Sequence, residues 1–224
     1  MKLEINVPTK LSEINLGQYQ RFLEIKDEGD GADFVNHKLI QIFCGADLAM
    51  VSKMRQRDII EIVNDVNKLF KSHPSLINEF ELNGKKFGFI PNLDNMSAGE
   101  YMDLDRYIVE PQLLHRAMSV LYRPIVRKYG DLYQIEEYDG TDKWCEAMKE
   151  MPVDVAISAM VFFYHLGNEL LKSTTVYLAE AIRGNSIQTR NSADNGDGIS
   201  QFTRLQKETY YDLMTLPNYQ LINA

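Results

Sequence analysis

The chain has 224 residues, of which 45% are hydrophobic and 25% charged, a composition that is ordinary for a soluble globular protein with a hydrophobic core. Its formal net charge of −8 and its sequence pI near 5.1 argue against nucleic acid as a direct, specific ligand bound through a broad basic face. No apolar run reaches the roughly 18 residues of a membrane span, so we expect none.

The N-terminal stretch lacks the apolar segment of a secretory signal, so we expect no such signal. Residues 1–8 are predicted to form an extended N-terminal arm that ends at Pro8. Cys44 and Cys145 lie far apart and neither has a metal-binding spacing nearby. We therefore expect two reduced thiols in a cytoplasmic setting rather than a disulfide.

Helical periodicity dominates the first third of the chain. A first helix carries apolar residues from Ile14 to Ile25 and ends before the glycine pair at 29 and 31. Asp33 is the expected N-cap of a second helix, which Gly45 closes. A short helix or turn is predicted at 47–52. A strongly amphipathic helix follows over 54–72, before Pro74.

Residues 80–90 are predicted to form a β-hairpin. Asn83 and Gly84 are the residues preferred in a type I′ turn, because both central positions of that turn have positive φ. Apolar and polar residues alternate on either side of them, and Pro91 then ends the ladder. Ser97 and Glu100 have the spacing of a capping box, which predicts a helix start.

The middle of the chain is predicted to be helical with one loop. Pro111 suits the first turn of a helix that runs to about Tyr122 and is ended or kinked at Arg123-Pro124. The polar and aromatic stretch 133–140 is predicted to be a loop, and 142–151 a helix.

The segment 153–171 is apolar nearly all round, as is typical of a buried central helix. Helix is also predicted at 177–182, a flexible polar loop at 185–198, and a C-terminal helix over about 199–216. Together these elements predict a mostly α fold: residues 1–224 form a single multi-helix globular domain with one small β-hairpin.

Several patterns that suggest chemistry have simpler explanations. The acidic loop Asp194–Gly198 fails the EF-hand pattern, because no alignment places oxygen ligands and the final glutamate together. Asp103 and Asp105 are two apart and point to different sides of a helix. The histidines share no short spacing, and His165 on the central helix is expected to be a core residue. We therefore expect no catalytic residue, no metal and no cofactor.

A protein interface is the one site that the residue pattern favours. The segment from Tyr122 to Tyr138 is rich in tyrosine and arginine and contains few aliphatic residues. Tyrosine and arginine are enriched in interface hot spots. If these phenol and guanidinium groups were packed inside a monomer, they would need many buried hydrogen-bond partners. The predicted interface residues are Tyr122, Arg123, Arg127, Tyr129, Tyr133 and Tyr138. We expect Arg123 and Tyr129 to be the anchors.

Several stretches together resemble a family of small helical virion and tail-morphogenesis proteins of tailed bacteriophages, most closely those of crAss-like phages of Bacteroidetes. They are Phe87–Asp94, Gly99–Asp105, His115–Ile125, Met151–Val153, Val161–Gly167 and the loop Asn195–Gly198. The resemblance covers residues 80–224 and is weaker before them. It implies a protein–protein role in the phage particle, and it supplies no catalytic residue.

The resemblance leaves three functional hypotheses open. The first is a non-enzymatic virion protein, made in the bacterial host cytoplasm, that is either a portal- or tail-associated ring component or an internal cargo protein. Its partners would be other phage structural proteins and further copies of itself. The second is a tail assembly chaperone that is absent from the mature particle. The third, from a different class, is an enzyme whose site is not recognisable in the sequence.

Overall fold

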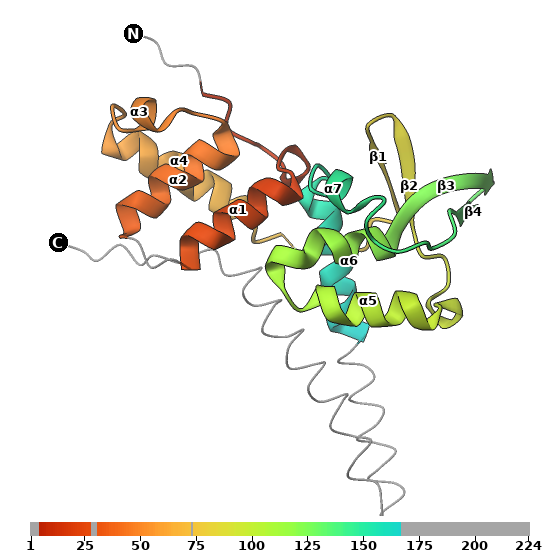
Figure 1. The fold of residues 1–224 in the computed structure, drawn as a ribbon. Coiled ribbons are helices and arrows are strands. Elements are labelled where there is room, and N and C mark those ends of the chain that lie inside the picture. The colour runs from red at the N-terminus through yellow and green to blue at the C-terminus, as the bar shows by residue number, and fades with distance from the viewer. Residues whose placement is uncertain (1–4, 28–30, 73, 167–224) are drawn as a thin grey trace, which may run out of the picture.

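The computed structural model describes residues 5–27, 31–72 and 74–166 (Figure 1). Helices form most of this part, as predicted, but the expectation of a single hairpin is wrong. Four strands form one antiparallel sheet in the order β1-β2-β3-β4, which makes the fold mixed α/β. The predicted loop at 185–198 and the C-terminal helix lie outside the described residues.

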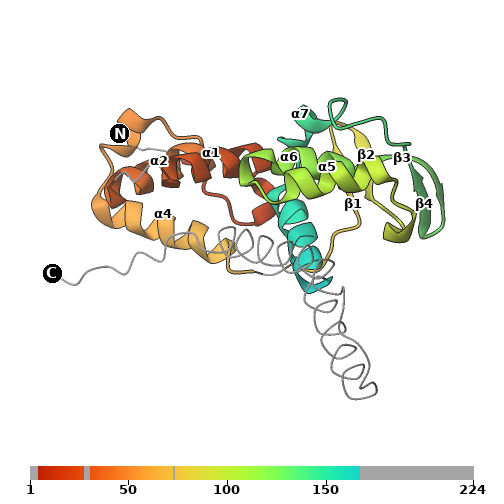
Figure 2. The same cartoon turned by 60° about the horizontal axis from the view of Figure 1, so that its bottom comes forward.

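The first lobe is built from helices. Its elements are the 3₁₀ turn Leu11–Glu13, α1 (Leu16–Asp27), α2 (Ala32–Cys44), α3 (Leu48–Val51) and α4 (Gln56–Leu69). Aromatic rings of α1, of α2 and of Phe70, the C-cap of α4, pack in its centre. The ring centroids of Tyr19 and Phe70 are 5.4 Å apart, and those of Phe22 and Phe43 are 5.2 Å apart. Figures 1 and 2 show these helices gathered on one side of the molecule.

Local capping chemistry sets where α2 and α3 begin and end. Gly45 ends α2 with φ of 66°, the left-handed conformation expected there, and Asp47 caps α3 through the backbone N–H of Ala49. The prediction for Asp33 is wrong, since Gly31 is the N-cap and Asp33 lies in the first turn. Cys44 is buried and free, and burial raises the pKa of its thiol to about 11.

The second lobe carries the sheet. Its strands are β1 (Glu79–Leu82), β2 (Lys85–Phe89), β3 (Tyr122–Tyr129) and β4 (Leu132–Ile135). Its helical elements are the 3₁₀ turn Leu93–Asn95, α5 (Ala98–Ile108), the 3₁₀ turn Pro111–Leu113, α6 (Leu114–Leu121) and α7 (Cys145–Met148). Asn83 (φ 51°) and Gly84 (φ 72°) join β1 to β2, so the predicted hairpin is confirmed.

The sequence did not predict strands β3 and β4, but the predicted end of the preceding helix near Tyr122 is confirmed. Helix α6 ends at Leu121, and the chain turns directly into a strand at Tyr122. Tyrosine, isoleucine and valine fit a pleated strand, and Pro124 cannot continue a helix. The predicted loop at 133–140 contains the last residues of β4, and the predicted helix 142–151 is reduced to the short α7.

The helix over 153–166 lies between the lobes and confirms the predicted buried helix over its described part. Residues from Val153 to Val161 are buried, apart from Asp154, which is half-buried. The backbone N–H of Val153 donates to the carbonyl of Ile14 at 2.8 Å, which ties this helix to the first lobe. Buried side chains of both lobes form one continuous hydrophobic cluster. His165, which we expected in the core, is exposed.

Candidate protein-interaction surface

Strands β3 and β4 form a two-stranded ribbon that extends beyond the rest of the sheet. Only Tyr122, Arg123 and Pro124 of β3 pair with β2, whereas the residues from Ile125 onward pair with β4. A register shift between Ile125 and Arg127 marks a β-bulge at Val126, a feature that bends a strand and increases its twist. Figure 1 shows this ribbon projecting at the end of the sheet lobe.

A tight turn closes the ribbon. Gly130 has φ of 60° and stands with Asp131 between the paired residues Tyr129 and Leu132. Glycine with positive φ at the first central position is what a type II′ turn requires, and such turns follow the natural twist of a hairpin. The turn therefore fixes Tyr129 opposite Leu132, at the far end of the ribbon.

One face of the ribbon is anchored to the sheet. The ring of Tyr133 covers Gly88, and its hydroxyl donates to the carbonyl of Phe89 at 2.9 Å. Lys128, which pairs with Tyr133 across the ribbon, forms an ion pair with Glu79 at 2.6 Å. These contacts hold the ribbon against the sheet through the face that carries Lys128 and Tyr133.

The opposite face of the ribbon is exposed. Arg127 pairs with Gln134 and Tyr129 pairs with Leu132, so these four side chains share a face. Tyr129 is 65% exposed and Leu132 is 76% exposed. An aromatic and an aliphatic side chain placed side by side in solvent, next to an arginine, have the composition of a protein-interaction patch.

Tyr122 and Arg123 belong to the interior. The hydroxyl of Tyr122 donates to the carbonyl of Ile77 at 2.8 Å, and its side chain is fully buried. Arg123 is buried and forms an ion pair with Glu100 of α5. The expectation that Arg123 is an interface anchor is therefore wrong, because its guanidinium is buried and paired with a carboxylate inside the fold.

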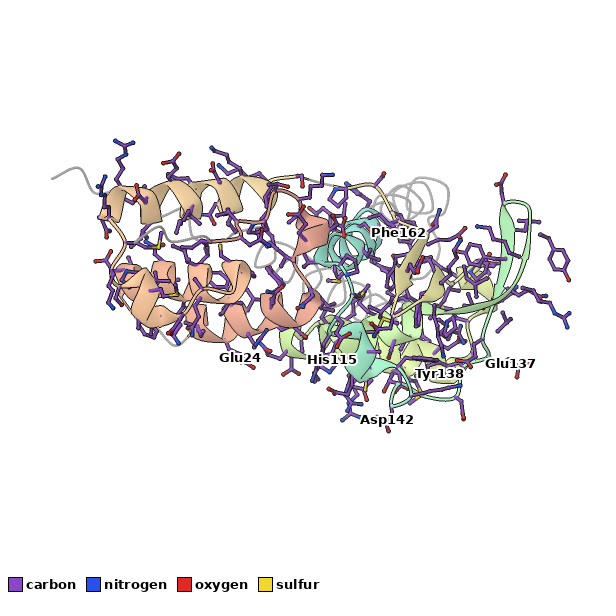
Figure 3. All side chains as sticks on the ribbon, turned by 90° about the horizontal axis from the view of Figure 1, so that it is seen from above. Glu24, His115, Glu137, Tyr138, Asp142 and Phe162 are labelled. Atoms are coloured by element: carbon purple, nitrogen blue, oxygen red, sulfur yellow. The ribbon has the colours of Figure 1, made fainter. Side chains whose placement is uncertain are left out.

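Tyr138 joins the same internal cluster. Its hydroxyl donates to a carboxylate oxygen of Asp103, and the Arg123 guanidinium lies 5.5 Å from its ring centre. Burial and the neighbouring Asp103 carboxylate raise the pKa of Tyr138. Figure 3 shows Tyr138 in the sheet lobe. The sequence did not predict that the hydroxyl groups of Tyr138 and Tyr133 would both have hydrogen-bond partners within the monomer.

The fold stabilises the ionised carboxylate of Glu100. Burial by itself would raise the pKa of its carboxyl group. The Ser97 backbone N–H donates to Oε2 at 2.6 Å, in the predicted capping box, and Arg123 adds a positive charge. Together these hold the pKa of Glu100 below its usual range. Glu100 and Asp103, for which the sequence predicted no catalytic role, each bond to a side chain within the fold: Glu100 to Arg123 and Asp103 to Tyr138.

A polar hollow of about 420 Å³ lies between the lobes and contains the buried His115. The side-chain amide of Gln20 is 3.1 Å from His115 Nδ1 and also donates to the carbonyl oxygens of Pro111 and Gln112. Burial and the nearby Lys149 charge lower the pKa of His115, which favours neutral imidazole. Figure 3 labels His115 near the place where the two lobes meet. These contacts give His115 a structural role in joining α1 to α6.

Within the described residues, no group of three or more histidine, cysteine, aspartate or glutamate side chains is placed to hold a metal ion. No helix in the described ranges is long and apolar enough to cross a membrane.

The residue pattern predicted Arg127 and Tyr129 as interface residues, but it did not predict Leu132 or the strand pairing that places Leu132 beside Tyr129. The available signal was Gly130-Asp131 between two stretches of strand-forming residues, which is a hairpin pattern.

Comparison of the chain with protein-family models, curated proteins and solved structures finds no match. The function must therefore be inferred from the residues and from the geometry of the ribbon.

Proposed function

We propose that this chain is a non-enzymatic component of a tailed-phage particle and acts through protein–protein contacts made by the β3–β4 ribbon. The observation that carries the proposal is the exposed face of that ribbon. Tyr129 and Leu132 form a cross-strand pair in solvent, while the other face of the same ribbon is anchored through Tyr133 and Lys128. Because one face of the ribbon is fixed against the sheet, the ribbon is preorganised, and binding a partner through its exposed apolar face costs little conformational entropy.

The sequence resemblance supplies the biological setting. It covers the part of the chain that includes both the ribbon and α5, and the proteins it points to act in virions and in tail morphogenesis. The acidic net charge of −8 also favours protein partners over nucleic acid. The ring-component and cargo versions of the proposal share this surface and differ only in where the chain sits in the particle.

Quantitative mass spectrometry of purified, mature particles tests the proposal. We expect the chain to be present in a fixed ratio to the major structural proteins. A chain that co-purifies with tail intermediates but is absent from mature particles would instead be an assembly chaperone. Absence from both fractions would contradict a role in the particle.

The ribbon itself is tested by a charged substitution at its exposed pair. Leu132→Asp should abolish incorporation into particles, because it places a carboxylate in the centre of an apolar contact. Met50→Asp is the matched control, since Met50 is also exposed but lies in the other lobe. Normal incorporation of a folded Leu132→Asp chain would exclude the ribbon as the contact surface.

A further inference from the structure

Within the described residues, most of the large apolar side chains exposed to solvent lie on the β3–β4 ribbon and on α5. Among the described residues, the large hydrophobic side chains exposed to solvent are Phe34, Met50, Tyr101, Met102, Val126, Tyr129 and Leu132. Five of these seven belong to the β3–β4 ribbon or to α5. Exposed apolar side chains that cluster in this way mark interaction sites, whereas scattered ones need no explanation.

The patch on α5 is as exposed as the one on the ribbon. Tyr101 is 60% exposed and Met102 is 70% exposed, and Asp105 is also exposed. Tyr101 and Asp105 are four residues apart and Met102 and Asp105 are three apart, so the three share one side of the helix. Helix α5 thus presents an aromatic ring, a thioether and a carboxylate together.

The ribbon presents the complementary set: an aromatic ring at Tyr129, an aliphatic side chain at Leu132 and a guanidinium at Arg127. Neither Arg127 nor Asp105 takes part in an ion pair within the described part of the chain. Each patch therefore has two exposed apolar groups beside a charge that has no ion-pair partner, and these two charges are opposite in sign. Two other exposed charges lie nearby: Arg106, whose guanidinium lies 5.5 Å from the ring centre of Tyr107, and Asp131 in the turn of the ribbon.

We propose that the ribbon of one copy packs against α5 of a second copy, with Arg127 facing Asp105 and with Tyr129 and Leu132 covering Tyr101 and Met102. This inference rests on the proposed function and names the partner of the same surface. Its physical basis is the complementary charge and the matched apolar content of the two patches.

Such a contact joins two different surfaces, so every copy would use its ribbon on one side and its α5 on the other. A head-to-tail contact of this kind generates a ring if the rotation closes and a filament if it does not. The two patches are also held in a fixed relation within each copy. Arg123 of β3 is ion-paired to Glu100 of α5, and Tyr138 is hydrogen-bonded to Asp103.

Charge reversal provides a direct test by sedimentation velocity of the full chain over a range of concentrations. The parent chain should self-associate, and Arg127→Asp or Asp105→Arg alone should each weaken association by roughly tenfold or more, since like charges then face each other. Arg57→Asp and Glu61→Arg on α4 are matched controls, because both residues are exposed in the other lobe, and they should leave association unchanged.

The decisive measurement uses the two single variants together. In an equimolar mixture, Arg127 of the Asp105→Arg chain meets Asp105 of the Arg127→Asp chain, and the two new side chains also meet as an opposite pair. Association should therefore return in the mixture, and likewise in the double variant. A monomeric parent chain, unaffected single variants, or a mixture that stays dissociated would each overturn the inference.

This experiment is independent of the one that tests the proposed function. A chain that is present in particles but shows no reciprocal rescue would keep its role in the particle and lose α5 of a second copy as the partner. A chain that shows rescue but is absent from particles and tail intermediates would self-associate as inferred, outside a phage assembly.

Discussion

The ring of Tyr133 lies directly over Gly88, and the absence of a side chain at Gly88 is what lets the β3–β4 ribbon fold against the sheet. A Cβ atom built at Gly88 would lie 2.5 Å from Tyr133 Cε2 and 3.0 Å from Ile125 Cγ1. The Tyr133 ring cannot swing aside freely, because its hydroxyl is bonded to the Phe89 carbonyl. This contact explains why a glycine stands in the middle of β2, where it would otherwise weaken a strand.

Gly88→Ala should therefore lower the free energy of unfolding by about 1–3 kcal/mol through overpacking. Urea denaturation followed by circular dichroism measures the change. Gly99→Ala is the matched control, because a Cβ there would meet only Ser97 Oγ, at 4.0 Å, and Gly99 lies in the first turn of a helix. Equal stability of the Gly88→Ala chain and the parent would mean that Tyr133 does not cover Gly88.

The turn between β1 and β2 gives a second prediction. Gly84 has φ of 72°, and a β-branched residue in that conformation costs roughly 1–3 kcal/mol. Gly84→Val should thus lower the melting temperature. Gly99→Val should not, because Gly99 lies in the first turn of α5, does not have positive φ, and has room for a side chain: a Cβ there would meet only Ser97 Oγ, at 4.0 Å. A Gly84→Val chain that melts with the parent would contradict a type I′ turn.

The third prediction concerns the helix over 153–166. Phe163 is 7% exposed and its ring packs against those of Phe89 and Phe162. Phe163→Ala should cost about 3–5 kcal/mol of stability, and Phe162→Ala should cost less because Phe162 is only half-buried. Guanidinium denaturation of both variants checks the order. Two variants as stable as the parent would show that this helix does not form the core.

The buried ion pair between Arg123 and Glu100 is a fourth test. Arg123→Met should destabilise the protein by roughly 3–5 kcal/mol, because it leaves the Glu100 carboxylate buried without its positive partner. Pairing that change with Glu100→Gln should recover part of the loss, since no buried charge then remains. Arg127→Met is the control on the same strand, where the side chain is exposed, and it should change stability little.

The same pair sets a pH dependence. The pKa of Glu100 is lower in the folded chain than its ordinary value of 4.5, so the folded state favours the ionised carboxylate. The stability it contributes is fully present above pH 4.5 and is lost as the pH falls through the lowered value. The difference in unfolding free energy between the parent and Glu100→Gln should therefore shrink below pH 4.5. If the stability advantage of the parent over Glu100→Gln instead grew as the pH fell, the pKa of Glu100 would be raised in the folded chain, and burial of its ionised carboxylate would be unfavourable.

The last prediction concerns the acidic stretch 194–198, which was predicted to be part of a loop and fails the EF-hand pattern. Neither EDTA nor added calcium should change the melting temperature. A calcium-dependent rise of several degrees would instead reveal a bound ion, because a ligand that binds only the folded state stabilises it.

Features set by neighbouring residues were determined by the sequence alone. Asn83-Gly84, the Ser97 and Glu100 capping box, and the end of α2 at Gly45 all formed where the residue pattern predicted them. In each of these a side chain, or its absence, acts on backbone only a few residues away. The burial of residues 153–161 was also predictable, because an apolar segment of that length must be covered.

The ribbon and its exposed face were decided by the tertiary structure. A strand forms only when a partner strand accepts its backbone hydrogen bonds, and β3 pairs with β2, which lies far back in the chain, as well as with β4. The same long-range packing brought Glu100 to Arg123 and Gly88 beneath Tyr133. Tyrosine and arginine are suited equally to a buried hydrogen bond and to a protein interface. Only the position of each side chain in the fold therefore separated the internal Arg123 from the exposed Arg127.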